Sequence, residues 1–318
     1  MTLRSVINVL LILTLAQILP GFSDSGRTTQ DIIEHSVARI ELPASGPRGP
    51  QKTNKDSLGI VTDAPSVIIR DVNSGVVLMS RGADIKRPIA SITKLMTALV
   101  LLDDYEWEWN DDAVVIADDV REGGKWYYRF NDNMTMDDLF TAMIVASGNN
   151  ETLALVREVG EGETAFVSKM NDKARAFGMH DTTFADPIGL DPTMMSTAKD
   201  VMILLNEALN REEINSRMHQ THVMATSQSG NQYKIASTNH LFTSFLNEDP
   251  YTIVGGKTGS LIEAGYCLTT RIERDGHILD VTVLGASEPD ARFSDVEALV
   301  SWAFDVYSWD DESDLATL

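Results

Sequence analysis

The stretch that most constrains the fold is PIASITKLMTALVLL, residues 88–102. Pro88 suits the first position of a helix, because the N–H that proline lacks would have no partner there. After Lys94 the residues are apolar on every side of such a helix. A helix with this pattern is typically buried all round, inside a domain rather than on its surface.

Two polar residues, Ser91 and Lys94, stand at the start of this apolar run. A helix brings positions i and i+3 onto one face, so the two side chains can touch. A charged lysine at the mouth of a buried helix is costly unless it has a partner. The pair is either a nucleophile with its base or the polar end of a buried helix, and this pattern alone leaves both interpretations open.

Length and charge narrow the class of protein. With 318 residues, 43% hydrophobic and 23% charged, the chain can form one large globular domain or two ordinary ones. The net charge of −21 repels nucleic acid and anionic membranes, so neither is expected as a partner. The acidic clusters at 103–119 and 305–314 are typical of a solvated surface.

The single cysteine, Cys267, excludes an intramolecular disulfide and a metal cluster built on thiolates. It lies in AGYCLTT, whose alternation indicates a strand, so we expect a small core residue there. His219 and His222 are spaced i, i+3, but no third ligand type clusters with them, which argues against a zinc site.

Residues 1–23 are expected to be a signal peptide. One arginine precedes an apolar stretch at 6–19, which is short for a bilayer span but typical of a secretory segment. An uncleaved N-terminal anchor is the alternative, and it would be the chain's only contact with a membrane. In both cases we expect an exported protein of the periplasm or cell envelope.

The rest of the chain divides by composition into three parts. Residues 24–60 are rich in Ser, Gly, Pro and charge, and we expect a flexible linker there. Order should begin near Asp63, and residues 61–310 should form one domain. An acidic tail follows at 311–318.

Within that domain the sequence predicts strands towards both ends and helices between them. Hairpin turns are indicated at Asn73-Ser74-Gly75 and at Asp275-Gly276. Helices are predicted at 90–103, about 136–146, about 151–159, about 163–177 and about 197–210. A last helix is predicted at SDVEALVSWAFDVYSW, and its inward residues are Val296, Leu299, Val300, Ala303 and Val306. This order favours an α+β fold: an antiparallel sheet flanked by helices, plus an all-helical lobe with a cleft between the two.

Three short polar motifs stand out, and two of them occur twice. S-x-x-K occurs at Ser91–Lys94 and at Ser196–Lys199, S-G-N at 147–149 and 229–231, and K-T-G once, at 257–259. Ser196 heads a predicted helix and is explained as its N-cap. The second S-G-N lies in TSQSGNQYK, which is wholly polar and typical of an exposed turn.

The first S-G-N is different, because apolar helical runs lie on both sides of it in MIVASGNNETLALV. We therefore expect the turn to lie at depth, with Ser147 and Asn149 pointing into the space that the helices enclose. Buried polar groups need partners or a function. Lys257 and Thr258 offer a cation and a hydroxyl on a strand edge that an extended peptide could pair with. The ordered set of three motifs is far more specific than any one of them and favours an active site.

With these motifs the chain resembles the low-molecular-mass serine penicillin-binding proteins, the D-alanyl-D-alanine peptidases, from about residue 65 to 305. The likeness extends to PIASITKLMTALVLLD, FVSKMNDKARAFGMHDTTFADPIGL, STAKDV, STNHLF and KTGSLIEAGYCL, in family order. The TNHLF and AGYCL segments are most similar to the D-alanyl-D-alanine endopeptidase branch. The resemblance implies that residues 61–310 are a catalytic domain with the fold of penicillin-recognising serine transpeptidases and β-lactamases.

The resemblance also implies a mechanism. Ser91 would attack a D-alanine carbonyl and form an acyl-enzyme, with a neutral Lys94 as base, its charge disfavoured by burial near a second cation. Ser147 would relay the proton to the leaving amine, and Asn149 would hold Lys94 or the substrate amide. Substrate binding would fall to Lys257, Thr258 and Gly259, with the N–H groups of Ser91 and Ser260 as oxyanion hole. No metal or cofactor is required.

The expected partners are peptidoglycan stem peptides, with β-lactams as covalent inhibitors. A carboxypeptidase that trims terminal D-alanine is the alternative nearest in chemistry. A class A β-lactamase would need Glu-x-x-Leu-Asn, which NEALN at 206–210 misses by one residue. A catalytically idle wall-binding scaffold is disfavoured, because a scaffold has no need of an intact nucleophile, base and relay.

Overall fold

The computed structural model describes residues 49–121 and 125–309, which belong to the second of two compact units, residues 47–318. The predicted signal peptide at 1–23, the linker up to residue 48 and the acidic tail at 311–318 lie outside the described residues. Within the described ranges no helix is long and apolar enough to cross a membrane.

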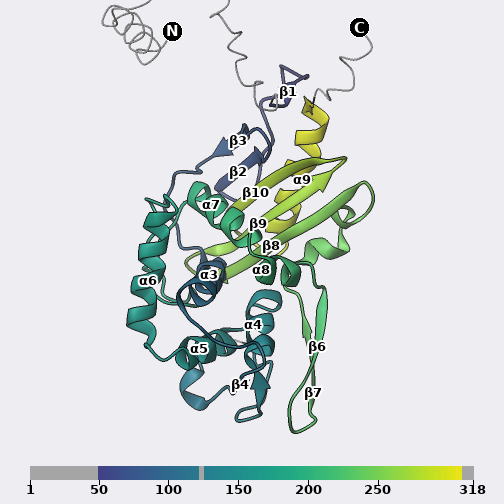
Figure 1. The fold of residues 1–318 in the computed structure, drawn as a ribbon. Helices are drawn as coiled ribbons and strands as arrows, with labels where there is room; N and C mark the ends of the chain where they lie inside the picture. Colours follow the sequence, from purple (N-terminus) through teal and green to yellow (C-terminus); the bar gives the residue numbers. More distant parts are fainter. Residues whose placement is uncertain (1–48, 122–124, 310–318) are drawn as a thin grey trace, which may run out of the picture. The chain divides into compact units, whose positions relative to one another are not determined.

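A five-stranded antiparallel sheet forms the centre of the domain, in the order β3-β2-β10-β9-β8 (Figure 1). Its strands are β2 (Ser66–Asp71), β3 (Val77–Arg81), β8 (Tyr251–Leu261), β9 (Gly265–Arg274) and β10 (His277–Ala286). Both predicted hairpins are confirmed. Gly75 turns with φ +74°, and Asp275 and Gly276 turn with φ +52° and +81°. Among the described strands, β8 is an edge of this sheet.

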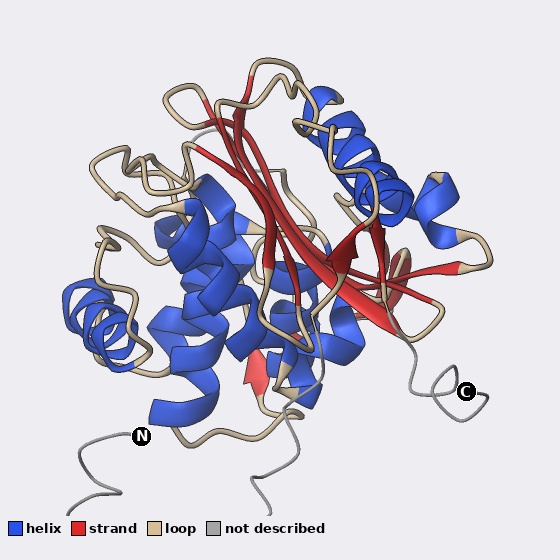
Figure 2. Ribbon diagram, turned by 90° about the horizontal axis from the view of Figure 1, so that it is seen from above, coloured by secondary structure: helices blue, strands red, loops and turns tan. Residues whose placement is uncertain are grey.

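Helices cover both faces of the sheet (Figure 2). On one face lies α9 (Ala291–Val306), whose predicted inward residues are all buried. On the other face lies α7 (Ala198–Leu209), against which α3 (Lys94–Asp104) packs. The side chains of β2 alternate accordingly: Val67 and Ile69 join the core beneath α9, and Ile68 joins the core of the helical side.

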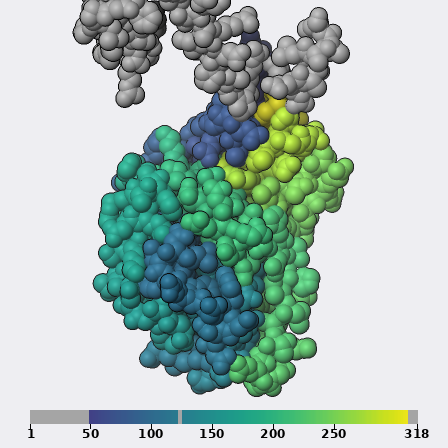
Figure 3. All heavy atoms as spheres, viewed as in Figure 1, coloured from purple at the N-terminus to yellow at the C-terminus, as the bar shows by residue number. Residues whose placement is uncertain are grey.

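Helix α3 lies among the other helices, as its apolar pattern predicts. Its residues from Lys94 to Leu101 are all buried. It packs against α4 (Met136–Val145), α6 (Glu163–Ala176) and α7. The other helices of this side are α5 (Asn149–Glu158), which packs on α4, and α8 (Glu212–Met218), which packs on α4 and α7. The five predicted helices of this part are confirmed, although the first opens with a 3₁₀ turn, Ala90–Thr93, and α8 has no counterpart in the prediction. In Figure 3 this side of the domain, helices and connecting loops together, is seen in blue and teal.

Three pairs of short strands complete the described part of the fold, and the sequence pattern predicts none of them. β4 (Asp112–Ala113) pairs with β5 (Met134–Thr135), β6 (His222–Thr226) with β7 (Gln232–Ala236), and β1 (Gln51–Lys52) with β11 (Tyr307–Ser308). The chain is thus tied to the domain well before Asp63, where order was expected to begin. Such short strands are held mainly by backbone hydrogen bonds, which leave little side-chain periodicity to detect.

Candidate active site

Ser91 and Lys94 meet where the 3₁₀ turn runs into α3. Lys94 Nζ lies 2.9 Å from Ser91 Oγ, so the helical spacing does bring the two side chains into contact. The preceding residue, Ala90, has φ +49°, a left-handed value that costs a non-glycine residue about 1–2 kcal/mol. Strain of this kind persists where the surroundings fix the backbone, often at functional sites.

The Lys94 amine has three oxygen neighbours. Besides Ser91 Oγ, they are Asn149 Oδ1 at 2.7 Å and the carbonyl oxygen of Ile188 at 2.8 Å. An amide oxygen and a carbonyl oxygen can only accept hydrogen bonds, so a neutral amine donates its two N–H groups to them. Its lone pair then faces the Ser91 hydroxyl, which is the arrangement that a general base requires.

Burial is the main reason why the pKa of Lys94 falls from 10.5 to about 7. Two carboxylates, Asp186 and Glu151, oppose this fall, because they favour the charged amine. Lys257 lies near enough for Lys94 to lower its pKa, in line with the expected second cation. The charges that act most on Lys94 itself are nevertheless acidic.

Ser147 lies in the turn between α4 and α5. Its backbone is left-handed, with φ +61°, and its Oγ is buried without a hydrogen-bond partner among the described residues. Gly148 follows, where an added Cβ would lie 2.3 Å from Glu151 Oε2. A buried hydroxyl without a partner costs about 1–3 kcal/mol, so the strained and unsatisfied Ser147 is a candidate to bind a group from outside the chain.

Lys257 and Thr258 lie on β8 and are both buried. Lys257 Nζ donates to the carbonyl oxygen of Thr258 at 3.3 Å, and no carboxylate of the described chain forms an ion pair with it. Burial, together with Lys94 and Arg292, holds the pKa of Lys257 well below its usual range. The Thr258 hydroxyl lies 2.6 Å from the hydroxyl of Thr238. A buried amine without an ion-pair partner among the described residues, beside a hydroxyl, is well suited to an anion supplied by a ligand, because the anion would favour the charged ammonium form.

Two glycines pack directly against the backbone that carries Ser91. A Cβ added at Gly259 would lie 2.5 Å from the carbonyl oxygen of Ile89, and one added at Gly189 would lie 2.0 Å from that of Ala90. Gly189 also has φ +86°. The close approach brings β8, and with it the exposed Ser260, beside the Ser91 turn.

Arg292, on α9, is a site residue that the sequence pattern does not reveal. Its Nη1 donates to the carbonyl oxygen of Gly259 at 2.9 Å, and its Nε is buried without a partner among the described residues. The guanidinium also contributes to the lowered pKa of Lys257. Only the packing of α9 against the sheet brings it here.

Asp186 is a second addition, and it lies in the FADPIGL segment of the resemblance. Its Oδ1 accepts from the N–H of Ile188 at 2.7 Å and also from the N–H of Gly189. It therefore fixes the loop whose Ile188 carbonyl accepts from Lys94. The resemblance to the family includes this segment, but it does not indicate a role for the carboxylate of Asp186.

The second copies of the motifs do not build a second site. Ser196 Oγ lies 2.8 Å from Thr182 Oγ1, and Lys199 pairs with Asp84. The predicted N-cap is wrong by one residue: Thr197 has the extended backbone of a cap, and its side chain accepts from Asp200 N. The S-G-N at 229–231 lies in the turn between β6 and β7, as predicted.

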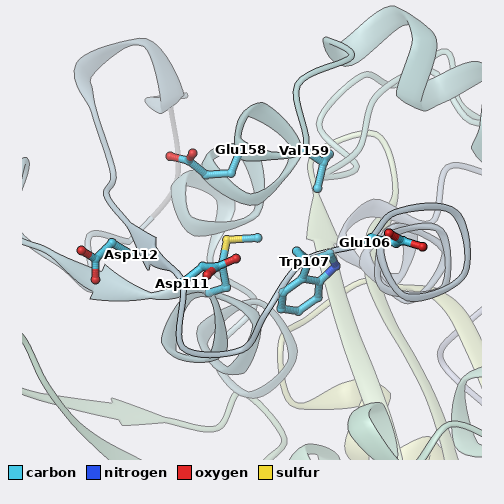
Figure 4. A pocket seen from close by; sticks show the side chains of 7 residues that line it. Glu106, Trp107, Asp111, Asp112, Glu158 and Val159 are labelled. Atoms are coloured by element: carbon cyan, nitrogen blue, oxygen red, sulfur yellow. The ribbon is translucent and has the colours of Figure 1, made fainter.

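A pocket of about 410 Å³ elsewhere on the domain is lined by four acidic side chains with Trp107 (Figure 4). It contains none of the predicted site residues. In the part of the chain that the structure describes, no group of three or more His, Cys, Asp and Glu could hold a metal ion. The Ser91 site therefore stands as the candidate active site.

Comparison with known proteins agrees with this geometry. Residues 51–288 match the D-alanyl-D-alanine carboxypeptidase family of serine peptidases. The chain belongs to this family. It is thus a serine hydrolase, and the resemblance noted in its motifs is confirmed.

Relatives carry two kinds of name. The D-alanyl-D-alanine endopeptidase of Pseudomonas aeruginosa is 32% identical, over 74% of this chain and 76% of that protein. The D-alanyl-D-alanine endopeptidase of Escherichia coli is 30% identical, over 84% and 87%. A D-alanyl-D-alanine carboxypeptidase of Bacillus subtilis is 26% identical over 81% of this chain, but the match spans only 66% of that longer protein.

Solved structures confirm the predicted fold class. Penicillin-binding protein D2 of Listeria monocytogenes, in its ampicillin-bound form, is 30% identical with a TM-score of 0.67, covering 78% of this chain and all of that one. The Streptomyces K15 DD-transpeptidase is 23% identical with a TM-score of 0.72, over 79% of this chain and all of that one.

Proposed function

We propose that this chain is an exported serine peptidase that cleaves D-alanyl-D-amino-acid cross-links between peptidoglycan stem peptides through a Ser91 acyl-enzyme. One observation carries the proposal: Lys94 Nζ lies 2.9 Å from Ser91 Oγ while two other oxygens, Asn149 Oδ1 and the carbonyl oxygen of Ile188, lie near enough to accept both N–H groups of a neutral amine. A pKa of about 7 makes that neutral form abundant at neutral pH.

In the first step Lys94 takes the Ser91 proton while Oγ bonds to the carbonyl carbon of a D-alanine. The N–H groups of Ser91 and Ser260 would stabilise the oxyanion that forms. The C–N bond then breaks, and the leaving amine receives a proton through Ser147, whose buried Oγ has no partner in the described protein. Water hydrolyses the ester, with the proton returning to Ser91 Oγ.

The carboxylate beyond the scissile bond would lie against Lys257, Thr258 and Arg292. Lys257 on β8 and Arg292, which donates to Gly259 on the same strand, are both buried basic side chains, and the Nε of Arg292 has no partner among the described residues. Charge-assisted hydrogen bonds of this kind are roughly twice as strong as neutral ones. The carboxylate would also neutralise a cluster of positive charge that the free protein leaves uncompensated.

The choice of endopeptidase over carboxypeptidase rests on the relatives. The chain spans most of the length of the two endopeptidases and about two thirds of the carboxypeptidases. Carboxypeptidase action is the second candidate, because the family as a whole bears that description. Both reactions use the same acyl-enzyme and differ only in the leaving group.

Digestion of purified cross-linked muropeptides, followed by mass spectrometry, distinguishes the two reactions. Loss of dimers with the appearance of monomers supports an endopeptidase, and release of terminal D-alanine alone supports a carboxypeptidase. The Ser91→Ala variant is the control, and it should do neither. If neither product forms with the unmodified protein, the proposed function is wrong.

Two further proposals concern setting and inhibition. Because peptidoglycan lies outside the cytoplasmic membrane, we place the protein in the periplasm or cell envelope, with membrane contact only through an uncleaved N-terminal segment. The Listeria relative was solved with ampicillin and with cefotaxime. β-Lactams should likewise acylate Ser91 here and act as covalent inhibitors.

A further inference from the structure

A pocket of about 560 Å³ adjoins the candidate active site at the end of β8. Ser260 and Leu261 line one part of it, Gly285 at the end of β10 lines another, and Arg87 contributes the only cationic side chain. Its size is within the range of small-molecule sites. Ser260 lines the pocket, and the neighbouring Gly259 packs against the Ser91 turn, so the pocket lies next to the place where the acyl-enzyme would form.

Arg87 is unusual in that its side chain has no acceptor within residues 49–121 and 125–309. Every other arginine of the described residues donates at least one hydrogen bond from its guanidinium, whereas Arg87 has none and its Nε is buried. Of its five N–H donors Nε is buried without a partner, and an unsatisfied buried donor is costly. The missing acceptor is therefore to be sought in a ligand.

The position of Arg87 is fixed by its surroundings. Its backbone N–H and carbonyl group both bond to Ser196, at 2.8 and 2.9 Å. Its guanidinium lies across Gly285, where an added Cβ would be 2.5 Å from Nη2 and 2.8 Å from Cζ. A fixed backbone and a guanidinium that rests against the sheet reduce the freedom that the residue loses when it binds a ligand, which favours specific recognition.

The direction of the substrate along β8 says which part of it reaches this pocket. In the proposed reaction the carboxylate of the leaving group lies at Lys257 and Thr258, and the attacked carbonyl lies at Ser91 and Ser260. The acyl-donating arm must then continue past Ser260, away from Lys257. An extended peptide advances about 3.3 Å per residue, so the residue just before the attacked D-alanine is the first one that passes Ser260 towards the pocket that Ser260 lines.

We infer that Arg87 binds a carboxylate at the end of the side chain that precedes the attacked D-alanine, so that the enzyme selects stem peptides with an acidic residue there. The inference rests on the proposed function, because that function sets the direction of the peptide. A planar guanidinium can bind a carboxylate through two parallel hydrogen bonds, which gives geometric selectivity as well as affinity. The pocket's carboxylate, Glu263, is exposed and forms no ion pair with Arg87.

The test measures binding, so that it does not depend on turnover. In the Ser91→Ala protein, calorimetry compares two synthetic peptides that end in D-alanyl-D-alanine and differ in one group. The residue before the D-alanine pair ends in a carboxylate in one peptide and in a carboxamide in the other. The carboxylate peptide should bind about ten- to a hundredfold more tightly, and adding Arg87→Gln should abolish that difference.

Control variants separate recognition from loss of structure. Arg175→Gln, on the exposed face of α6, removes the same charge elsewhere and should preserve the preference. Glu263→Gln should preserve or increase it, and Arg87→Lys should retain part of it, with unfolding temperatures measured for every variant. Equal affinity of the two peptides, no binding of the carboxylate peptide, or equal weakening of both by Arg87→Gln in a folded protein overturns the inference. If Arg87-dependent preference is found but the unmodified protein cleaves neither peptides nor muropeptides, the proposed function fails and the binding site stands.

Discussion

Asn149 Oδ1 lies 2.7 Å from Lys94 Nζ, so the first residue of α5 holds the amine that contacts Ser91. The two residues are 55 positions apart in the sequence, yet both side chains are buried at one point. Asn149 also decides the role of the amine. Its amide oxygen accepts a hydrogen bond from the Lys94 amine. Because the amide is uncharged, the pKa of Lys94 is set by burial and by the two nearby carboxylates.

Replacing this amide with a carboxylate should shift the pH dependence of the enzyme. In Asn149→Asp, a negative charge beside Lys94 favours the ammonium form and raises its pKa, so acylation should require a higher pH by about one unit or more. The second-order rate of acylation by fluorescent penicillin, measured against pH, tests this. Asn210→Asp, on the exposed end of α7, is the matched control and should leave the profile unchanged. An unshifted or lowered profile in Asn149→Asp would argue against Lys94 as the base.

In the unmodified enzyme, too, the rate of acylation should depend on the protonation of Lys94 and therefore on pH. The pKa of Lys94 is about 7, and only the neutral amine can accept the Ser91 proton. Acylation should therefore rise with pH, reach half of its maximum near pH 7, and fall as acid protonates Lys94. Lys94→Ala should remove acylation while the protein stays folded. A flat profile between about pH 5.5 and 8.5, or undiminished acylation in folded Lys94→Ala, would show that another base serves.

The sequence predicts those parts of the site that local pattern determines. Ser91 and Lys94 are found because helical spacing pairs them, and Ser147 and Asn149 because apolar helices flank their turn. The α+β order of elements follows from the hairpin turns and helical periodicity in the same way.

Other parts depend on packing between distant segments, which leaves no local trace. Arg292 reaches Gly259 only because α9 lies against the sheet, and the Ile188 carbonyl reaches Lys94 only because Asp186 turns its loop inwards. The cap of α7 shows a finer limit. Serine and threonine are both favoured as N-cap residues, so the sequence does not distinguish Ser196 from Thr197. In the folded protein the Ser196 hydroxyl is hydrogen-bonded to Thr182 instead of capping the helix.

The glycine that packs against the Ser91 turn offers a test of the backbone geometry. Gly189→Ala would add a Cβ 2.0 Å from the Ala90 carbonyl oxygen. It would also require the new alanine at position 189 to adopt a left-handed backbone conformation, with φ near +86°. We expect a loss of about 2–4 kcal/mol of stability, with a large loss of acylation. Gly178→Ala is the matched control, because Gly178 has φ +80° and nothing within 4 Å of an added Cβ. Denaturant unfolding and acylation rates measure both variants, and equal behaviour of the two would contradict the packing argument.

Removing the buried ammonium on β8 should affect substrates according to their charge. For substrates with a carboxylate beyond the scissile bond, Lys257→Gln should raise the activation free energy of cleavage by about 1.5–3 kcal/mol. This slows cleavage by a factor of about ten to a hundred or more. Analogues amidated at that carboxylate should lose far less. The ratio of kcat/KM for the two substrates is the readout. Equal slowing of both would mean that Lys257 acts on the charge of Lys94 and does not receive the carboxylate.

The site of covalent attachment tests the central claim most directly, since the account requires Ser91 to be the nucleophile. Ser196 is a control within the same chain, because it has the same S-x-x-K spacing but its hydroxyl is hydrogen-bonded to Thr182. The protein is incubated with fluorescent penicillin, digested, and the labelled peptide is sequenced by mass spectrometry. The account predicts an adduct on Ser91, abolished in Ser91→Ala and retained in Ser196→Ala; an adduct on Ser196, or undiminished labelling of Ser91→Ala, would contradict it.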